Sequence, residues 1–288
     1  MNILEISQVT AGYGPKNIRA ESHGIADVDI DALQVLKDIS FSVPEGRNVC
    51  ILGANGSGKT TILRVLAGIL PYMGSVRISG KDIRRMKRRE IAGQLALMPQ
   101  FSEIYFSYSV RETVMLGRYL HMKSFFGTPG TADKEAVEEA MEATGLQDLA
   151  EHQIGELSGG QRQRVFLART FAQQTPVILL DEPTNHLDLR YQAELMEYLA
   201  DWSVKKTTLA DGSVRQNTVV GVFHDINLGM RIAQDVVFLK NGRIIAKGDK
   251  EEIIRPALLQ EVYDMDVVNY MKQQLAGWNE IGSEMYEK

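Results

Sequence analysis

The sequence GANGSGKTT at positions 53–61 is the feature that most constrains the fold of this chain. It matches the spacing G-x-x-x-x-G-K-[ST], in which glycines let consecutive backbone N–H groups curve around phosphate oxygens. The apolar run at 48–54 predicts a buried strand before the loop. Residues 60–70 predict a helix after it, whose N-terminus faces the same anion. Strand, loop and helix together predict an α/β domain that binds phosphate.

Lys59 and Thr60 carry the chemistry expected of this loop. The Lys59 ammonium would reach the β- and γ-phosphates of a nucleotide, and the Thr60 hydroxyl would coordinate Mg²⁺. The helix that follows is expected to turn one apolar side inward and to end before Pro71. Its inward side chains are expected to be Ile62, Leu63, Val65, Leu66 and Ile69.

Polar residues follow three further strand-like apolar runs. Asp181 and Glu182 end the run VILLDE, Gln100 follows LMP, and His224 follows VVGVF. Ligands gather at the carboxyl ends of strands in open α/β sheets. Asp181 is therefore expected to hold Mg²⁺ and Glu182 to act on water as a general base. We expect Gln100 to bind the metal or the attacking water, and His224 to donate a hydrogen bond to the γ-phosphate.

Each of these residues also has a structural interpretation when taken alone. An Asp-Glu pair can form a salt-bridged strand end, and a single histidine is more often structural than catalytic. The phosphate loop in the same chain favours the catalytic interpretation of Asp181, Glu182 and His224.

A second glycine-containing loop, LSGGQ at 157–161, precedes another helical pattern. Ser158 and Gln161 have the spacing of a capping box, which explains these two residues. Gly159 and Gly160 would each cost the helix about 1 kcal/mol relative to alanine. The glycines are therefore expected to allow a ligand to approach the backbone, and an exposed helix N-terminus suits a phosphate.

Composition narrows the classes of protein that fit. The chain has 288 residues, 44% of them hydrophobic, and a formal net charge of −5, so no overall basic field indicates nucleic acid. Cys50 is its single cysteine, which excludes intrachain disulfides and fits a reducing compartment. The segment KDIRRMKRRE at 81–90 holds six basic residues. A solvated helix face is the favoured interpretation of this segment, and a nucleic-acid patch is the alternative.

The order of apolar patterns predicts the organisation of the chain. A helical stretch at about 101–164 is expected to be inserted between buried strands of the α/β core. Two polar additions, at about 15–34 and 204–217, are expected on the surface, and Asp211-Gly212 in the second predicts a hairpin. The N-terminus has no signal-peptide pattern, and no apolar run reaches the about 20 residues of a membrane-spanning helix.

These motifs, in this order, resemble the ATP-binding subunit of ABC transporters. GANGSGKT resembles the Walker A motif, Gln100 the Q-loop glutamine, and LSGGQ the family signature. VILLDE resembles the Walker B motif with its catalytic glutamate, NHLD at 185–188 the D-loop with Asp188, and His224 the H-loop histidine. Tyr13 resembles the aromatic residue that stacks on adenine. The ATP-binding set implied by the resemblance is Tyr13, Gly53, Asn55, Gly56, Ser57, Gly58, Lys59, Thr60 and Thr61, with Thr60, Gln100 and Asp181 on Mg²⁺.

The resemblance implies a P-loop NTPase of the ABC type. Its α/β fold combines a mostly parallel core sheet, an antiparallel β portion and the inserted helical subdomain in one domain over residues 1–250. Residues 251–288 then form a C-terminal extension. The resemblance also implies a head-to-tail homodimer, in which Ser158, Gly159, Gly160 and Gln161 of one subunit close over ATP held by the other.

A finer resemblance lies in YSVRETVMLGRYLH at 108–121 and EEIIRPALLQEVYDMDV at 251–267. These segments are similar to those of importers for iron–siderophore complexes, haem and cobalamin. The resemblance implies an ATPase at the cytoplasmic face of the membrane, attached to permease subunits that an extracellular binding protein supplies. The alternatives are an ABC transporter for another substrate, a soluble ABC ATPase acting on nucleic acid or ribosomes, and a nucleotide-binding regulator without turnover. The combination of Glu182, Gln100 and His224 argues against the regulator.

Overall fold

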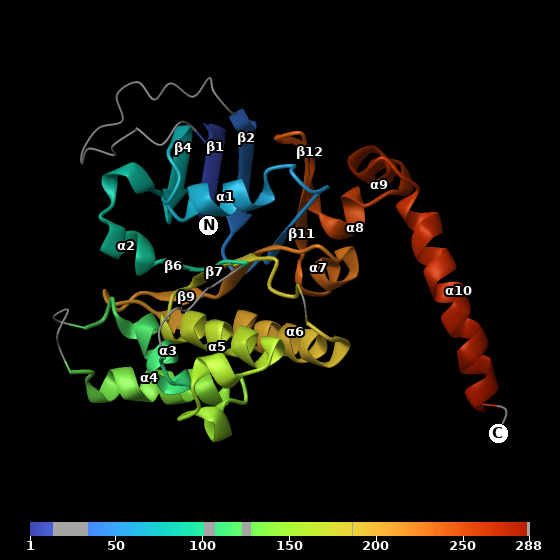
Figure 1. Ribbon diagram of the computed structural model, residues 1–288. Coiled ribbons are helices and arrows are strands. Elements are labelled where there is room, and N and C mark those ends of the chain that lie inside the picture. Colours follow the sequence, from blue (N-terminus) through green and yellow to red (C-terminus); the bar gives the residue numbers. More distant parts are fainter. Residues whose placement is uncertain (14–33, 101–106, 123–127, 186, 287–288) are drawn as a thin grey trace.

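A six-stranded sheet forms the centre of the computed structural model, which describes residues 1–13, 34–100, 107–122, 128–185 and 187–286 (Figure 1). Side chains are described as far as residue 276. The strand order is β12-β11-β3-β10-β7-β6, and all neighbouring pairs are parallel except β11 with β12. The strands are β3 (Val49–Leu52), β6 (Leu95–Met98), β7 (Val177–Asp181), β10 (Thr218–Val222), β11 (Asp235–Lys240) and β12 (Arg243–Asp249).

The central strands are apolar throughout because both faces of the sheet are covered. Every residue of β3, β7 and β10 is buried. Alternate residues of one strand serve different cores: Cys50 and Leu52 belong to the cluster under the helices, and Val49 and Ile51 to the cluster on the opposite face. The sheet thus separates two hydrophobic cores, and its mainly parallel order confirms the predicted core.

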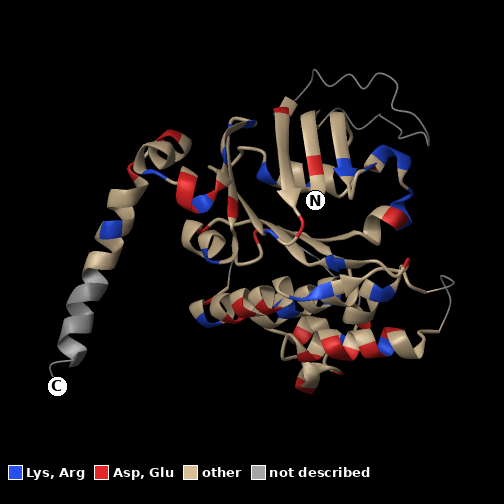
Figure 2. Cartoon of the chain, turned by 180° about the vertical axis from the view of Figure 1, so that it is seen from behind, with Lys and Arg blue, Asp and Glu red and all other residues tan. Residues whose placement is uncertain are grey.

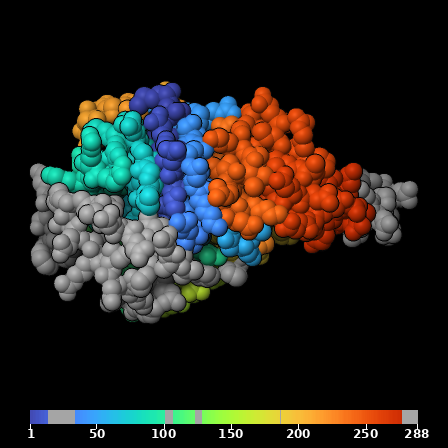
Figure 3. Space-filling model, turned by 90° about the horizontal axis from the view of Figure 1, so that it is seen from above, coloured from blue at the N-terminus to red at the C-terminus, as the bar shows by residue number. Residues whose placement is uncertain are grey.

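The second core lies between this sheet and a four-stranded antiparallel sheet of order β2-β1-β4-β5. Seen from above, β4, β1 and β2 lie next to one another, followed by the β11–β12 segment and the C-terminal helices (Figure 3). The antiparallel strands are β1 (Asn2–Gly12), β2 (Gln34–Pro44), β4 (Tyr72–Ile78) and β5 (Lys81–Asp82). This sheet confirms the expected antiparallel portion.

Helix α1 (Lys59–Leu66) buries four of its five predicted inward residues and ends earlier than expected. Gly68 takes a left-handed backbone conformation with φ of 66°, and its N–H donates to the Val65 carbonyl. Ile69 lies beyond this stop, and 58% of it is exposed. The prediction of an inward Ile69 was wrong because the helical period that supported it no longer applies there.

Helices between β6 and β7 cover the other face of the core sheet, below it in Figure 1. Ser109 and Glu112 form a reciprocal capping box at the start of the first one. The helices are α3 (Val110–Met115), α4 (Thr131–Glu142) and α5 (Gly159–Ala172), with short 3₁₀ turns at Leu116–Arg118, Gln147–Leu149 and Ile154–Glu156. α6 (Leu189–Ser203) follows β7 in the same layer.

The basic segment 81–90 differs from the predicted helix face. It forms β5, a 3₁₀ turn at Ile83–Arg85 and the short helix α2 (Arg88–Ala92). The Asp82 carboxylate accepts the Arg84 backbone N–H and so starts the 3₁₀ turn where a continuous helix was expected. Its Lys and Arg residues gather on the side of the molecule that carries α2 (Figure 2).

The addition at 204–217 forms the predicted hairpin. Strands β8 (Lys206–Thr208) and β9 (Val214–Gln216) pair around Asp211-Gly212. The Glu45 carboxylate, in the turn after β2, accepts the Gln216 backbone N–H at 2.9 Å and pairs with Arg215 at 3.3 Å. These contacts tie the hairpin to the body of the domain. The other addition, at 15–34, lies outside the described residues except for Gln34.

The C-terminal region comprises α7 (Ile226–Ile232), α8 (Lys250–Ile253), α9 (Pro256–Tyr263) and α10 (Val267–Tyr286). Leu259 and Val262 of α9 are buried in the same cluster as Cys50, and α10 extends away from the body (Figure 1). None of the helices formed by the described residues combines the length and apolar character needed to cross a bilayer.

A buried ion pair ties this helical layer together and can be tested. The Arg118 guanidinium donates to Asp133 at 3.1 Å and to the Ala172 carbonyl at 2.7 Å. Arg118→Met would leave a buried carboxylate uncompensated and should lower the free energy of unfolding by about 3 kcal/mol. Arg111→Met removes exposed pairs with Glu138 and Glu151 and should cost about 1 kcal/mol or less. Urea denaturation of both variants checks this, and equal losses would contradict it.

Candidate nucleotide site

The glycine loop begins where β3 ends, and its backbone lies against β11. A Cβ atom at Gly53 would lie 2.2 Å from the Leu239 carbonyl oxygen, so only glycine fits there. The Gly242 N–H, in the turn after β11, donates to the Ser57 carbonyl at 3.1 Å. The neighbouring strand therefore fixes both ends of the loop and leaves its central residues, Asn55 and Gly56, exposed.

The Lys59 side chain turns back into its own loop. Its ammonium donates to the Gly53 carbonyl at 2.8 Å and to the Ala54 carbonyl at 3.1 Å. Burial lowers the pKa of Lys59, and the carboxylates of Glu182 and Asp181 act in the opposite direction. A buried ammonium held by two neutral carbonyls is poised to exchange them for a stronger partner, such as a phosphate oxygen.

A hydrogen bond connects the helix after the loop to the end of β7. The Thr60 hydroxyl donates to Asp181 Oδ1 at 2.9 Å. Burial raises the pKa of Asp181, and this hydrogen bond opposes the shift. Two oxygen ligands that already lie in contact suit Mg²⁺, which binds a few protein oxygens and keeps the rest of its shell for water and phosphate. The described residues contain no cluster of three or more His, Cys, Asp or Glu that could hold a metal by itself.

Glu182, the next residue, lies in a network of amides. The Gln100 amide donates to Glu182 Oε2 at 2.7 Å, and the Asn185 amide donates to the same oxygen. Glu182 has a left-handed φ of 51°, and its N–H donates to the Val222 carbonyl of β10. This conformation directs Glu182 and Asp181 differently, so that the two carboxylates have separate partners.

These residues surround one cavity of about 640 Å³. Nine predicted site residues line it: Asn55, Gly56, Gly58, Lys59, Thr60, Thr61, Gln100, Glu182 and His224. His224 follows β10 and is exposed. The lining also includes Val35 and Asn185, which the sequence reading did not assign to the site. Asn185 begins the NHLD motif, so its place at the site could have been predicted from that motif. Val35 has an apolar side chain, and nothing in the sequence indicates that it lines the site.

Tyr13 lies beside the cavity rather than in its described lining. Its hydroxyl accepts from Arg64 Nη1 at 3.0 Å and lies 3.4 Å from the Thr61 hydroxyl. The Arg64 guanidinium stands 5.8 Å from the centre of the Tyr13 ring. The side chain is thus held against α1 at the end of β1, and its stacking on adenine stays a prediction.

The two glycines of the second glycine-containing loop have different structural surroundings. Ser158 and Gln161 form the expected capping box, with distances of 2.9 and 3.3 Å. A Cβ atom at Gly160 would lie 2.4 Å from the Tyr191 ring, but one at Gly159 would meet nothing within 4 Å. Gly160 is therefore required by packing within the chain, and the approach of a ligand to the two glycines stays a prediction. Ser158 and Gly159 are exposed and remain open to a ligand.

Tyr191 belongs to the helix that the D-loop begins. The Asp188 carboxylate caps α6 by accepting the Tyr191 N–H at 3.0 Å. The same Tyr191 lies against Gly160 and under the Arg164 guanidinium, at 5.3 Å. The predicted D-loop residue therefore orients the ring that fixes the signature helix. None of Ser158, Gly159, Gly160 and Gln161 is among the described residues that line the 640 Å³ cavity.

This packing generates a test. Gly160→Ala should displace the Tyr191 ring and lower the free energy of unfolding by about 1–3 kcal/mol. Gly159→Ala should raise the free energy of unfolding by up to about 1 kcal/mol, because its added methyl group meets open space and alanine is the better helix former. Adding Tyr191→Ala should reduce the effect of Gly160→Ala, as measured by urea denaturation in a double-mutant cycle. Equal effects at the two glycines would refute the packing explanation.

Comparisons with known proteins agree with this geometry. The family described as ABC transporter matches residues 36–185. The chain is 34% identical over 267 residues to the iron(3+)-hydroxamate import ATP-binding protein FhuC of Bacillus subtilis, covering 92% of this chain and 89% of FhuC. It is 35% identical over 232 residues to the ferric enterobactin transport ATP-binding protein FepC of Escherichia coli, covering 80% and 82%.

A solved structure gives the same fold. The ATP-binding cassette MJ0796, in a dimeric post-hydrolysis state bound to ADP and Pi, superposes with a TM-score of 0.67 at 26% identity. The match covers 85% of this chain and 98% of the cassette. The chain belongs to the ABC transporter family and is an ABC-type ATPase.

Proposed function

We propose that this chain is the motor subunit of an ABC importer and that the 640 Å³ cavity is its ATP site. The observation that carries this proposal is the cluster at the strand ends, where Thr60 contacts Asp181 and Gln100 contacts Glu182. Asn55, Gly56, Ser57, Gly58 and Thr61 would surround the phosphates with backbone N–H groups and hydroxyls. Gly53 would let the loop begin its turn.

Thr60, Asp181 and Gln100 would hold Mg²⁺, which supplies charge stabilisation to the transferring phosphoryl group when bound. Lys59 would leave the Gly53 and Ala54 carbonyls for the β- and γ-phosphates. A water directed at the γ-phosphorus would give its proton to the Glu182 carboxylate. Before this, the hydrogen bond from the Gln100 amide to Glu182 would weaken or break. The Gln100 side chain would then face the metal.

His224 would complete the site from the end of β10. It lines the cavity after β10, the strand next to β7, and a ring N–H could donate to the γ-phosphate. Tyr13 would stack on adenine from the end of β1, provided that it leaves Arg64. In this proposal the residues after β7, β10 and β1 have separate roles in accepting the proton, contacting the γ-phosphate and stacking on adenine.

The signature would act on a second subunit. Ser158 and Gly159 are exposed at the start of a 14-residue helix, and none of the signature residues lines the cavity of its own chain. A helix N-terminus with a serine hydroxyl binds anions. In a head-to-tail homodimer, Ser158, Gly159, Gly160 and Gln161 would approach ATP held by the partner, and Asp188 would lie at the same interface. The dimeric MJ0796 cassette supports such an assembly.

The names of the relatives support a proposal for the cargo and the other partners. FhuC and FepC are named for iron(3+)-hydroxamate import and ferric enterobactin transport. A further relative, with 35% identity over 242 residues, is named for cobalamin import. We therefore assign an iron complex or cobalamin as the cargo. The chain would sit at the cytoplasmic face of the membrane on permease subunits, which an extracellular binding protein supplies.

Glu182→Gln tests the assignment of the base. The variant should retain ATP binding, because Lys59 and the loop are unchanged, but turnover should fall by at least about 100-fold. Phosphate release, nucleotide binding and sedimentation with ATP measure the three consequences, the last being accumulation of a dimer. In vesicles with the permease and binding protein, uptake of ferric siderophore should stop as well.

Glu151→Gln is the matched control because Glu151 is an exposed carboxylate away from the cavity. It should hydrolyse ATP at the parent rate. Glu182→Gln turning over at the parent rate would exclude Glu182 as the base. Uptake of neither ferric siderophore nor cobalamin by the parent transporter, with ATP turnover intact, would exclude the cargo but not the ATP site.

A further inference from the structure

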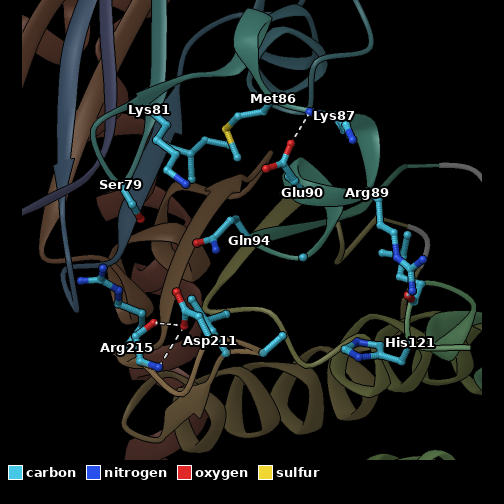
Figure 4. A pocket seen from close by; sticks show the side chains of 16 residues that line it. Ser79, Lys81, Met86, Lys87, Arg89, Glu90, Gln94, His121, Asp211 and Arg215 are labelled. Carbon is cyan, nitrogen blue, oxygen red and sulfur yellow. Dashed lines mark hydrogen bonds between the residues drawn. The ribbon is translucent and has the colours of Figure 1, made fainter. Parts of the chain in front are cut away.

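A second cavity, of about 580 Å³, lies between three segments that the ATP site does not use (Figure 4). Its walls are the β4–β5 turn, helix α2 with the residues that follow it, and the β8–β9 hairpin. Leu120 and His121, between α3 and α4, complete the lining. Two sequence features that the ATP site leaves unexplained, the basic segment 81–90 and the addition 204–217, thus meet at this cavity.

The cavity lies at the opposite edge of the core sheet from the ATP site. Gln94 lines it and immediately precedes β6, and the hairpin that lines it immediately precedes β10. β6 and β10 both run parallel to β7, so their starts lie at one edge and their ends at the other. The ends carry Gln100 and His224. A molecule in the second cavity therefore cannot be part of the bound ATP.

The charge of the lining favours an anion. Four of the lining residues are Lys or Arg (Lys81, Lys87, Arg89 and Arg215), against two carboxylates, Glu90 and Asp211. Both carboxylates are already engaged: Glu90 accepts the Lys87 backbone N–H, and Asp211 accepts the N–H and hydroxyl of Ser213. Burial lowers the pKa of His121, which keeps it neutral at pH 7. Arg215 also pairs at 3.3 Å with Glu45, which does not line the cavity, so the four cations exceed the three nearby carboxylates by one charge.

Unpartnered polar atoms are concentrated in the same walls. The described residues have six buried side-chain nitrogen or oxygen atoms without a hydrogen-bond partner, and three of them belong to this lining. They are Ser79 Oγ, Gln94 Oε1 and Arg215 Nε. All three atoms are covered by neighbouring side chains, so those side chains must move before a ligand can reach them. An unsatisfied buried polar group costs about 1–3 kcal/mol, and a ligand that satisfied all three would offset that movement.

The positions of these groups indicate where the two ends of a ligand would lie. Ser79 and Lys81 lie together on one wall, above Arg215, and the Gln94 amide lies between that wall and Asp211 (Figure 4). Ser79 Oγ and Arg215 Nε can donate to an anion, whereas Gln94 Oε1 can only accept. The side chains of Lys81 and Met86, which extend over this space, are long and flexible enough to be displaced by a ligand.

The remaining lining is apolar. Ile78, Met86, Leu120, Leu209 and Ala210 contribute to it. The volume of about 580 Å³ is within the range of about 300–1,000 Å³ that is usual for small-molecule sites. The lining thus combines these apolar side chains with a larger number of polar and charged groups, which suits a small ligand that has both an apolar body and polar ends.

We propose that this cavity binds a small organic acid with an apolar body and a hydroxyl group. The carboxylate lies against Ser79, Lys81 and Arg215, the body lies against Met86 and Leu209, and the hydroxyl donates to Gln94 Oε1. This site is distinct from the ATP site and does not depend on hydrolysis.

The probes are 4-hydroxybenzoate, benzoate and phenol, tested on the full-length chain by isothermal titration calorimetry and ligand-observed NMR. The hydroxy acid should bind best, benzoate more weakly because it offers nothing to Gln94, and phenol most weakly because it lacks the anion. Absence of binding by all three at millimolar concentration would overturn the proposal. Phenol binding as tightly as 4-hydroxybenzoate would overturn the anion assignment.

Matched variants locate the binding. Lys81→Gln removes a charge from the lining and should weaken 4-hydroxybenzoate binding about fivefold. Lys206→Gln removes the same charge from the hairpin outside the lining and should leave affinity unchanged. Ala210→Trp, at an exposed position of the hairpin turn, should fill the cavity and abolish binding. Equal effects of Lys81→Gln and Lys206→Gln, or full affinity in Ala210→Trp, would place the binding elsewhere.

Discussion

The hydrogen bond from the Thr60 hydroxyl to Asp181 joins the two halves of the proposed ATP site. Thr60 is in the first turn of α1, and Asp181 ends β7, two strands away from β3 across the sheet. The contact exists only because β3, β10 and β7 are parallel and end at one edge. Every other assignment at the site, from Lys59 to His224, depends on this shared edge.

The shared edge also explains which parts of the site could be predicted from the sequence. Apolar runs that are buried on both faces have a recognisable composition, and Asp181, Glu182 and His224 follow such runs directly. Their convergence could therefore be predicted without knowing the strand order. The partners of Glu182 could not, because the amides of Gln100 and Asn185 reach it through loop conformations that leave no periodic pattern.

At three places the sequence did not indicate the structural cause that acts there. The cause is either a contact with a residue distant in sequence or a local stop in the helix. Ile69 faces solvent because Gly68 ends α1 before it. Gly160 is determined by Tyr191, 31 positions later, whose ring occupies the space of a Cβ atom. The segment 81–90 was expected to be one helix, but the Asp82 side chain starts a 3₁₀ turn instead. Glycine and aspartate are recognised signals for the stop at Gly68 and the turn at Asp82, whereas nothing in composition or spacing indicates the contact of Gly160 with Tyr191.

The central claim is that one ATP site is built from two chains. Lys59→Ala and Ser158→Arg are each combined with Glu182→Gln to trap the closed state. A homodimer of either variant would have both sites damaged and should therefore not form with ATP. A mixture contains heterodimers in which one site has an intact Lys59 and an intact Ser158. Sedimentation with ATP should therefore show dimers in the mixture and none in either variant alone. An ATP-dependent dimer of the Ser158→Arg variant alone, or none in the mixture, would contradict the account.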